Sequence, residues 1–481
     1  MTTHTTLIGG AWVGSDSTVE VLNPADVRHV VGSVPALAGE QVELAYRSAR
    51  AGFMEWSAMN PLTRSAVLAR AADLLRERAE ALAEVLVSEN GKTAAEARGE
   101  VEKSADFFDY YSAMGRLSQG ELLADGRLGT TVTVRREPLG VVLVITPWND
   151  PLLTPCRKLA PALAAGNAVV LKPASETPLV ALELARVLVD AGIPMQALQV
   201  VTGRARTIAS ALIASDEIDA ITFTGSTEVG LELQDQVAGR NLRVQTEMGG
   251  KNAAIVLADA DLDLAVATIV AAAFAQGGQR CTATSRILVE RSIHQDFVGR
   301  LVRAAEAIRL GRPDETGTSL GPLISRSHQS DVLKRIEAAT SDGAELRTGG
   351  GQPSGPGFEN GCWVEPTILD GVEPTSTIWT EEVFGPVVAV LPVDSLDEAI
   401  ALANESVYGL SASLFTTQLA ATTTFLERIE AGQVAVNLPT SGWDVHHPFG
   451  GFKMSGSPFK EQGTEALNFY TRVKTCAVRA V

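Results

Sequence analysis

From Gly140 onward, short apolar segments typical of β-strands alternate with segments of helical periodicity. Strands that are apolar along their whole length need helices on both faces, which is the arrangement of a doubly wound parallel sheet. A second alternating stretch runs from about Asn252 to Pro448. The pattern therefore predicts an α/β protein with two such parts. The first four strands of the pattern are VVLVIT (141–146), NAVVLK (167–172), LQVVTG (198–203) and DAITFT (219–224).

Predicted helices and two isolated strands flank this pattern. Residues 61–88 place apolar residues at helical spacing with Arg and Glu between them, which predicts one long amphipathic helix, and residues 91–114 predict another. Residues 127–138 alternate with a period of two, and residues 467–480 have similar character. Two strands so far apart in sequence can pair into one arm, and such arms often join subunits. We therefore expect a homodimer or a homotetramer.

Composition limits the class of protein. The 481 residues are 45% hydrophobic and carry a formal net charge of −17, which disfavours binding to the phosphates of nucleic acid. No apolar run reaches the roughly 18–20 residues of a membrane span, and the first residues lack the basic and apolar segments of a secretory signal. Four cysteines are too sparse for a disulfide framework, and no Cys/His cluster indicates a metal site. These features predict a soluble cytoplasmic protein that binds neither nucleic acid nor a membrane.

Three segments carry residues suited to catalysis. Cys281 lies among Gly and small polar residues in QGGQRCTATSR (276–286), whereas a structural Cys usually lies in an apolar run, so a nucleophile and a structural thiol both remain open. Glu247 ends a predicted strand before two glycines, although a capping or salt-bridging Glu is the more common interpretation. Asn149, in TPWNDP (146–151), offers an amide donor where α/β sheets bind ligands, or simply forms a turn.

Two further segments follow predicted strands and open helices, as phosphate-binding turns do. They are LKPASETP (171–178) and FTGSTEVG (223–230). Gly225 and Gly230 permit close backbone approach, and a helix N-terminus has unpaired N–H groups for a phosphate. Neither segment is a GxGxxG motif or a P-loop, so each alone is weak evidence. Lys172 could hold a ribose or a phosphate, or only solvate a surface.

Taken together and in order, these segments closely resemble the NAD(P)-dependent aldehyde dehydrogenase superfamily along essentially the whole chain. Within it, the chain is most similar to the succinate-semialdehyde and 2-oxoglutarate-semialdehyde dehydrogenases. The interval from Glu247 to Cys281 also fits the family pattern. The matching signatures are PWN (147–149), KPAS and TP (172–178), FTGSTEVG (223–230), EMGGKN (247–252), GQRC (278–281), EEVFGP (381–386) and PFGGFKMSG (448–456).

The resemblance implies a fold in three parts. A Rossmann-type dinucleotide-binding domain is expected at 1–124 and 140–249, and an α/β catalytic domain at 250–450. A small β oligomerisation arm is expected at 125–139 and 460–481.

The resemblance also implies an oxidoreductase mechanism with a cysteine nucleophile. Cys281 attacks the aldehyde carbon as a thiolate, and the Asn149 amide and the Cys281 N–H stabilise the oxyanion. Hydride transfer to the nicotinamide then leaves a thioester, which is hydrolysed by a water that Glu247 activates. Lys158 matches a position proposed as a proton relay, with Glu461 as its partner, although one extra residue precedes Glu461 here.

The expected cofactor is NAD or NADP. The family pattern assigns Lys172 and Glu382 to the two riboses, Phe384 to the nicotinamide ribose, and Gly225 with Ser226 to the pyrophosphate. Relatives often carry a Glu that would repel a 2′-phosphate where this chain has Ser175, so we expect NADP to be accepted. The implied cofactor-binding residues are Thr146, Pro147, Trp148, Lys172, Ser175, Gly225, Ser226, Gly249, Glu382 and Phe384.

The substrate positions depart from those of enzymes for simple aldehydes. Arg157 stands where a tunnel Trp is common, and the pair Arg157–Lys158 matches the succinate-semialdehyde dehydrogenases; a guanidinium suits a carboxylate because its forked donors bind both oxygens. Against this, Ala275 replaces a second Arg of those enzymes, and Asp150 could instead neutralise Arg157. The implied substrate residues are Asp150, Arg157, Trp443, His446 and Phe449.

The region around the last three of these residues is similar to the 2-oxoglutarate-semialdehyde dehydrogenases. There His446 and His447 fit a tunnel wall better than a metal site. The resemblance therefore predicts oxidation of a carboxylate-bearing semialdehyde to the acid. The alternatives are an enzyme for uncharged aliphatic or aromatic aldehydes, and a CoA-acylating enzyme, whose relatives lack the acid at Glu247.

Overall fold

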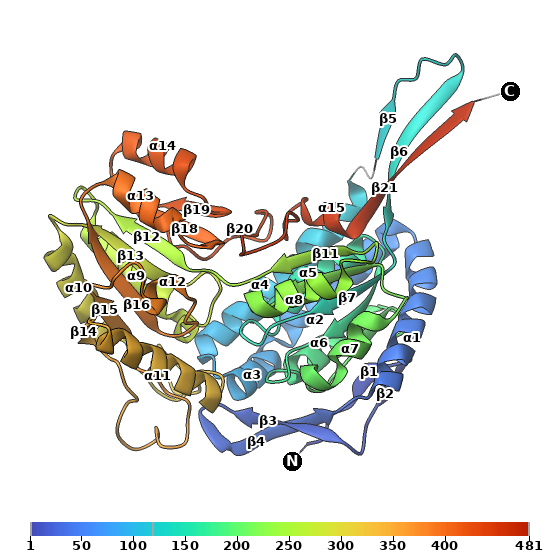
Figure 1. The fold of residues 1–481 in the computed structure, drawn as a ribbon. Coiled ribbons are helices and arrows are strands. Elements are labelled where there is room, and N and C mark those ends of the chain that lie inside the picture. The colour runs from blue at the N-terminus through green and yellow to red at the C-terminus, as the bar shows by residue number, and fades with distance from the viewer. Residues whose placement is uncertain (1, 118–119, 480–481) are drawn as a thin grey trace.

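A computed structural model describes residues 2–117 and 120–479 of the chain, and Figure 1 shows two α/β parts side by side with a β arm projecting from one of them. The predicted ranges 1–124, 460–481 and 467–480 include residues 1, 118–119, 480 or 481, which lie outside the described residues.

The first part contains a five-stranded parallel sheet in the order β11-β10-β7-β8-β9. Its central strand, β7, buries the side chains of Val141 to Val144 completely, because helices cover the sheet and keep water from its faces. The predicted alternation of strand and helix is confirmed. The strands are β7 (Val141–Ile145), β8 (Ala168–Lys172), β9 (Leu198–Val200), β10 (Ala220–Thr224) and β11 (Arg243–Glu247), and the helices are α5 (Leu153–Ala164), α6 (Leu179–Ala191), α7 (Ala205–Ala214) and α8 (Thr227–Val237).

The chain before this sheet adds strands and helices around it. They are β1 (Thr6–Ile8), β2 (Ala11–Val13), β3 (Thr18–Asn23), β4 (Asp26–Pro35), α1 (Gly39–Ala58), α2 (Pro61–Glu77), α3 (Ala79–Asn90), α4 (Ala94–Ala113) and the short helix η1 (Met114–Arg116). Helix α1 packs against β8, β9 and α7, whereas α2, α3 and α4 pack on α5 and α6. Helix α1 and the four strands before it were not predicted.

The single long helix predicted for residues 61–88 is wrong. Two helices, α2 and α3, meet at Arg78, where the backbone leaves the helical region (φ −102°, ψ 15°). The break turns the chain so that α3 contacts β3 as well as α4 and α6. Tertiary packing therefore overrides an uninterrupted helical periodicity. The second predicted helix, 91–114, is confirmed as α4, which begins after a capping box between Thr93 and Glu96.

The second part contains a seven-stranded sheet in the order β14-β15-β16-β13-β12-β18-β19, in which all neighbours are parallel except β14 and β15. Its strands are β12 (Asn252–Val256), β13 (Thr284–Glu290), β14 (Glu345–Thr348), β15 (Thr367–Asp370), β16 (Val387–Val393), β18 (Ser411–Phe415) and β19 (Gln433–Val436). The helices are α9 (Leu262–Phe274), η2 (Ala275–Gly278), α10 (His294–Glu306), α11 (Arg326–Ser341), α12 (Thr377–Thr380), α13 (Leu396–Asn404) and α14 (Leu419–Arg428). The small strands β17 (Tyr408–Gly409) and β20 (Phe452–Lys453) pair with each other.

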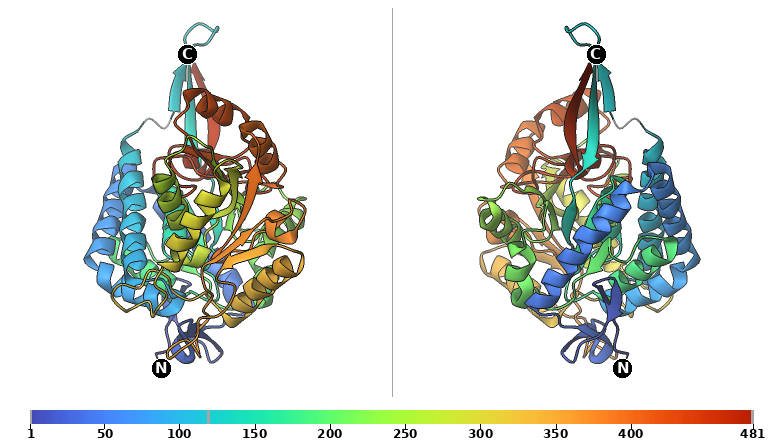
Figure 2. Two further views of the ribbon diagram at one scale, coloured as in Figure 1. Left: turned by 90° about the vertical axis from the view of Figure 1, so that its left-hand side faces the viewer. Right: turned by 90° about the vertical axis from the view of Figure 1, so that its right-hand side faces the viewer.

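The arm is a three-stranded antiparallel sheet. Strand β6 (Thr130–Pro138) pairs with β21 (Thr471–Arg479), which confirms the predicted pairing of these distant segments. Strand β5 (Gly120–Leu123), which was not predicted, extends the sheet on the other side of β6. The start of the predicted C-terminal strand is instead a short helix, α15 (Ala466–Tyr470), which packs on α5. Both views in Figure 2 show this arm extending away from the rest of the molecule.

The chain crosses between the two parts twice, and the two crossings touch. The first joins β11 to β12 through residues 248–251, and the second lies between β19 and α15. The backbone N–H of Met248 donates to the carbonyl of Ser455 (2.8 Å), and Glu247 forms a bridge with Gly456. The two crossings therefore bring the end of β11 into the space between the two parts.

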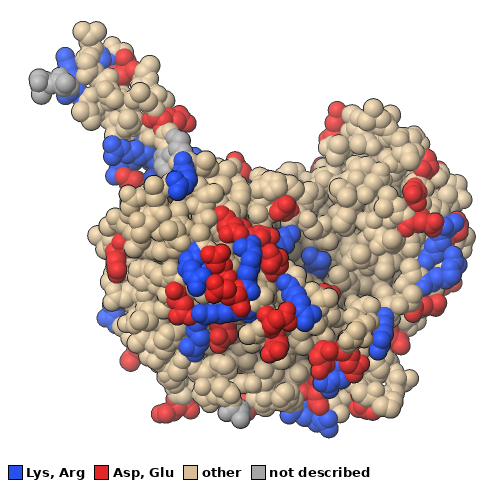
Figure 3. Space-filling model, turned by 180° about the vertical axis from the view of Figure 1, so that it is seen from behind, with Lys and Arg blue, Asp and Glu red and all other residues tan. Residues whose placement is uncertain are grey.

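The surface carries charges of both signs. On the face seen in Figure 3, red and blue side chains are mixed rather than separated into single-sign patches. On helices α2 and α4, for example, Arg76 forms ion pairs with Glu102, Asp106 and Asp109. Over the described part of the chain, no helix is both long enough and apolar enough to cross a membrane.

Candidate active site

A cavity of about 290 Å³ lies where the two parts meet. Residues after the carboxyl ends of β7, β10 and β11 form one wall, and loops of the seven-stranded part form the other. This is the edge at which parallel α/β sheets bind ligands. Of the predicted site residues, the cavity is lined by Pro147, Trp148, Asn149, Asp150, Arg157, Gly225, Ser226, Glu247, Gly249, Cys281, Glu382, Phe384, Trp443 and Phe449.

Cys281 lies in the loop between η2 and β13, half-buried and at the cavity wall. Its carbonyl accepts a hydrogen bond from the side chain of Asn252 (2.8 Å), and a Cβ on Gly250 would lie only 2.7 Å from the same oxygen. Asn252 thus holds the loop in place, and Gly250 leaves room for its close approach. Burial raises the pKa of the Cys281 thiol to about 12, against the opposing charge of Arg157. The sulfur therefore needs a nearby base to become a thiolate.

Glu247 ends β11 and reaches the same cavity with its carboxylate buried. Burial, and then the charge of Glu461, raise its pKa well above the ordinary range. Neither carboxylate oxygen has a hydrogen-bond partner in the structure. A Cβ on Gly450 would lie 2.5 Å from one of these oxygens, so only glycine fits there, and its φ of +144° also favours glycine. A buried carboxyl group with a raised pKa is suited to accept a proton near neutral pH.

Lys158 lies on α5, fully buried, and does not line the cavity. It forms a close ion pair with Glu461 and donates a hydrogen bond to the hydroxyl of Thr222 (2.8 Å). Burial lowers its pKa, although Glu461 opposes this effect. The charges of both Lys158 and Glu461 act on Glu247, so the pair is placed to tune that carboxyl group.

Asn149 follows β7 and is buried at the cavity wall. The residue before it, Trp148, makes edge contacts with Phe384 (5.4 Å between ring centroids) and His328 (5.6 Å). Its carbonyl accepts a hydrogen bond from the side chain of Asn90 (2.7 Å). The turn that carries Asn149 is thus fixed from both parts of the molecule.

Several predicted cofactor residues form a surface suited to a dinucleotide. A Cβ on Gly249 would lie 2.2 Å from the Glu382 carboxylate, so this glycine leaves room for that group beside the backbone. A Cβ on Gly225 would lie 2.5 Å from the ring of Phe223, and Ser226 caps the N-terminus of α8. The hydroxyl of Thr146 is buried without a partner. A helix N-terminus, an acid and an unpaired hydroxyl beside one cavity fit the phosphate and hydroxyl groups of such a cofactor.

Three predicted cofactor residues lie next to the cavity lining rather than in it. Thr146 donates its backbone N–H to the carbonyl of Lys172 (3.1 Å), so the ends of β7 and β8 are adjacent. Burial lowers the pKa of Lys172 to about 8, and its amino group donates to the carbonyl of Pro173. Ser175 donates to the carbonyl of Gly203 (3.2 Å). Thr146 and Lys172 are thus buried at the ends of neighbouring strands, outside the cavity lining.

The predicted substrate residues line the cavity, with one exception. His446 is exposed, lies outside the cavity lining and is 3.8 Å from Asp444. Asp150 pairs with Lys92 (2.7 Å), whereas the acid nearest to Arg157 is Glu461 (3.7 Å). Direct neutralisation of Arg157 by Asp150, which the sequence left open, is therefore not seen.

Sequence reasoning missed several residues of the cavity wall, including Lys103, Arg280, His328 and Gln462. Lys103 lies on α4 and donates to the carbonyl of Trp443 (2.6 Å). Burial lowers its pKa, and the charges of Arg157 and Arg280 act in the same direction. Arg280 could have been suspected, because it precedes Cys281 in the chain. For Lys103 and His328 no local pattern distinguishes them from surface residues.

Comparisons with known proteins agree with this geometry. The sequence profile described as "Aldehyde dehydrogenase family" matches residues 12–476. The alpha-ketoglutarate semialdehyde dehydrogenase of Haloferax volcanii is 42% identical over 97% of this chain and 97% of its own length. The alpha-ketoglutaric semialdehyde dehydrogenase of Bacillus subtilis is 38% identical over 99% and 98%. A betaine aldehyde dehydrogenase from Staphylococcus aureus, solved in complex with NAD+, superposes with a TM-score of 0.96 at 32% identity, over 98% of this chain and 94% of that one.

Proposed function

Because this chain belongs to the aldehyde dehydrogenase family, we propose that it oxidises an aldehyde bearing a carboxylate, such as 2-oxoglutarate semialdehyde, to the corresponding acid. The family uses NAD or NADP, and the residues at the cavity fit such a cofactor. The relatives in Haloferax volcanii and Bacillus subtilis are named for this semialdehyde. The observation that carries the proposal, however, is the charge of the cavity wall.

Three cationic side chains, Lys103, Arg157 and Arg280, line the same cavity. The one acid among the substrate residues, Asp150, is already paired with Lys92. The Arg157 guanidinium lies over the ring of Phe449 (4.7 Å), and its Nε is buried with no hydrogen-bond partner among the residues that the structure describes. Donors so arranged favour an anionic group, and a carboxylate matches the fork of a guanidinium. Lys103 and Arg280 supply the positive charge that the missing Arg at Ala275 would have added.

The reaction we propose begins at Cys281. Its thiolate bonds to the aldehyde carbon, and the carbonyl oxygen becomes an oxyanion that accepts hydrogen bonds from the Asn149 amide and the Cys281 N–H. The former aldehyde carbon then loses its hydride, for which NAD or NADP, when bound, would be the acceptor, and the acyl group remains on Cys281 as a thioester. Glu247 removes a proton from water, which attacks the thioester, releases the acid and returns the sulfur to its free state. Lys158 and Glu461 would pass that proton onward.

The cofactor would be held by residues on both sides of the cavity. We propose that Lys172 and Glu382 bind its riboses, that Gly225 and Ser226 bind its pyrophosphate, and that Phe384 packs beside the nicotinamide end. In this arrangement the five-stranded part is the cofactor domain and the seven-stranded part is the catalytic domain. A carboxylate at position 247 also favours release by water over release by CoA.

The test is the substitution Arg157→Ala. Loss of a charged hydrogen bond of about 1.5–3 kcal/mol should raise KM for 2-oxoglutarate semialdehyde about 10- to 150-fold. KM for an uncharged aldehyde of similar length should stay within about twofold. Lys103→Met should act in the same direction, and Arg98→Ala, at an exposed arginine paired with Glu80, is the matched control. An unchanged KM for the semialdehyde in Arg157→Ala would refute the assigned substrate class.

We also propose that the protein acts in the cytoplasm as a homodimer or homotetramer joined through its arm. The support is the exposed apolar side chains of this arm, which include Leu122, Val473 and Val478. Such side chains on a projecting sheet edge are typical of surfaces that pair with another subunit.

A further inference from the structure

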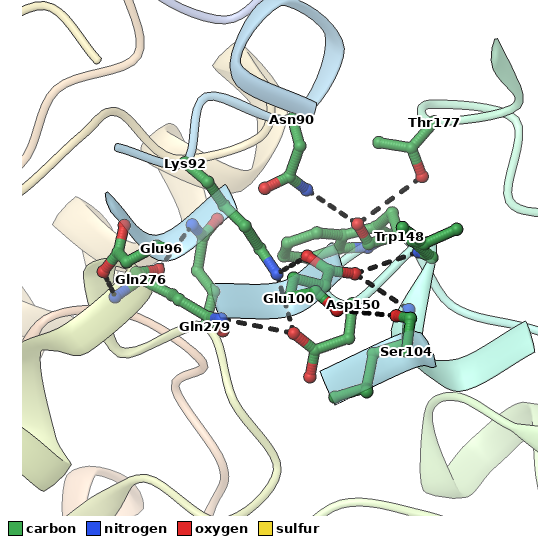
Figure 4. A network of polar contacts seen from close by, with 12 residues as sticks. Asn90, Lys92, Glu96, Glu100, Ser104, Trp148, Asp150, Thr177, Gln276 and Gln279 are labelled. Atoms are coloured by element: carbon green, nitrogen blue, oxygen red, sulfur yellow. Dashed lines mark hydrogen bonds and ion pairs between the residues drawn. The ribbon is translucent and has the colours of Figure 1, made fainter. Parts of the chain in front are cut away.

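Behind the cavity wall formed by Trp148 and Asn149 lies a buried polar network, and one of its members, Asp150, also lines the cavity (Figure 4). At its centre is Lys92, in the turn between α3 and α4. The Lys92 amino group contacts the Glu100 carboxylate and donates to Asp150 (2.7 Å). The side chains of Lys92 and Glu100 are each 2% exposed. Charges so deeply buried are stable only when they are paired.

The network holds the turn that carries Asn149. Asp150, the next residue in the chain, is bound by Lys92. Glu100 accepts hydrogen bonds from the backbone N–H groups of Leu152 (2.9 Å) and Leu153 (3.0 Å), where α5 begins. Together with the bond from Asn90 to the carbonyl of Trp148, these contacts fix the backbone on both sides of Asn149.

The same network reaches the segment that leads to Cys281. The side chain of Gln276, in η2, donates to Asp150 (3.2 Å), and its backbone N–H donates to Glu96 (2.7 Å). Gln276 has a left-handed backbone (φ 55°), as do the two glycines after it. A non-glycine residue keeps this conformation only when its surroundings hold it. Asp150 is therefore shared between the two loops, one from each part of the molecule, that carry Asn149 and Cys281.

We propose that Lys92 is a positioning residue, which acts through Asp150, Glu100 and Gln276 to set the place of the Asn149 amide relative to the Cys281 sulfur. The proposal rests on the roles assigned above to Asn149 and Cys281, but not on the identity of the aldehyde. Displacements of about 1 Å in such a site can lower the rate about 100-fold without altering binding. The effect of losing Lys92 should consequently fall on kcat.

The experiment compares Lys92→Met with the double variant Lys92→Met/Glu100→Gln. The single variant leaves two carboxylates buried together, so it should lower both Tm and kcat, the latter by about 10- to 100-fold. The double variant removes one of these charges and keeps an acceptor for the Leu152 and Leu153 N–H groups. It should recover part of the lost Tm while kcat stays low, because Asp150 still lacks its ion-pair partner Lys92. Lys334→Met, at an exposed lysine, is the matched control.

The values of kcat, Tm and KM in these variants either support or overturn the positioning role of Lys92. Wild-type kcat in Lys92→Met, or full recovery of kcat together with Tm in the double variant, would overturn the positioning role. KM for the cofactor should stay within about twofold in both variants, and a rise in this KM in place of a fall in kcat would also overturn it.

A readout that needs no aldehyde separates this proposal from the proposed function. It is the rate at which iodoacetamide alkylates Cys281, measured by mass spectrometry, which should change at least about threefold in Lys92→Met. If the wild-type protein oxidised no aldehyde, the proposed function would fail. The alkylation rate would still test the network, and an unchanged rate would then overturn the role of Lys92.

Discussion

Cys281 and Glu247 share one cavity, and burial raises the pKa of both. The same desolvation that keeps the sulfur protonated gives the carboxyl group the proton affinity of a base that works near neutral pH. The Glu247 carboxylate lies close against Gly450, which fixes its position. Neither of its oxygens has a hydrogen-bond partner among the described residues, so no such partner neutralises its charge. At the scale of single residues, desolvation thus controls the protonation of the two groups of this site, the Cys281 thiol and the Glu247 carboxyl group.

The raised pKa of Glu247 predicts a pH dependence. Glu247 acts as a base only when deprotonated, so kcat should fall as pH decreases through its raised pKa, that is, at values above the ordinary range of about 4–5. A kcat–pH profile with the preferred aldehyde measures this limb. In Glu247→Gln the acidic limb should vanish and hydrolysis of the thioester should become rate-limiting, seen as a burst of reduced cofactor at 340 nm. An acidic limb retained in that variant would contradict the role.

Ser175 predicts the tolerance for NADP. Its hydroxyl bonds to the carbonyl of Gly203 beside Lys172, and it carries no charge that would repel a 2′-phosphate. In Ser175→Glu the added charge should cost about 1–4 kcal/mol for NADP, which lowers its kcat/KM relative to that of NAD by about fivefold or more. Ser175→Gln is the uncharged control of similar size. Equal ratios in the Glu and Gln variants would show that another residue selects the cofactor.

At the scale of elements, the start of α4 has two functions. Thr93 and Glu96 form a capping box, and Glu96 also accepts the backbone N–H of Gln276 from the other part of the molecule. One helix end therefore stabilises itself and supports the segment before Cys281.

These two functions can be separated by substitution. Thr93→Ala should lower the free energy of unfolding by about 1 kcal/mol through loss of the cap, with kcat unchanged. Glu96→Ala should lower both the free energy of unfolding and kcat, because it also removes the acceptor of the Gln276 backbone N–H. Thermal melts and steady-state kinetics on the two variants provide the measurement. A fall in kcat for Thr93→Ala as large as that for Glu96→Ala would contradict the distinction.

At the scale of the whole molecule, the projecting arm leaves large apolar side chains that the described residues do not cover. Leu122 and Val478 lie on the same side of its sheet, through their pairing with Thr133 and Thr131, and they are 73% and 66% exposed. Apolar side chains so exposed on a projecting sheet are unfavourable in a monomer.

The exposed apolar side chains of the arm therefore predict an oligomer, and charged residues introduced in their place should disrupt it. The double substitution Leu122→Glu/Val478→Glu should shift the protein to a smaller assembly, measured by size-exclusion chromatography with light scattering. Leu419→Glu, at a similarly exposed leucine on α14 (80%), is the control and should not change the mass. A wild-type protein that is already monomeric, or an unchanged mass in the double variant, would refute the role of the arm.

Strong local patterns were enough to predict much of this fold. The buried strands around β7 are apolar because both faces of the sheet are covered, so their identity can be recognised without knowing their neighbours. The pairing of β6 with β21 followed from two isolated alternating segments. Likewise, Asn149, Glu247 and Cys281 stand in ordered motifs at strand ends and loops, and the structure brings all three to one cavity.

Only the tertiary structure decided the break at Arg78, the placement of Lys103 and Arg280 beside Arg157, and the pairing of Asp150 with Lys92. The periodicity of a sequence indicates which side of a helix is apolar. It does not indicate that the helix breaks at Arg78, where the chain turns so that α3 packs on β3. The charge of a cavity depends on side chains that are distant in sequence and gain their effect through lost solvation. Residues that stand in one motif can thus be predicted from the sequence. The charge and solvation of a cavity cannot, because they arise only when elements distant in sequence have packed together.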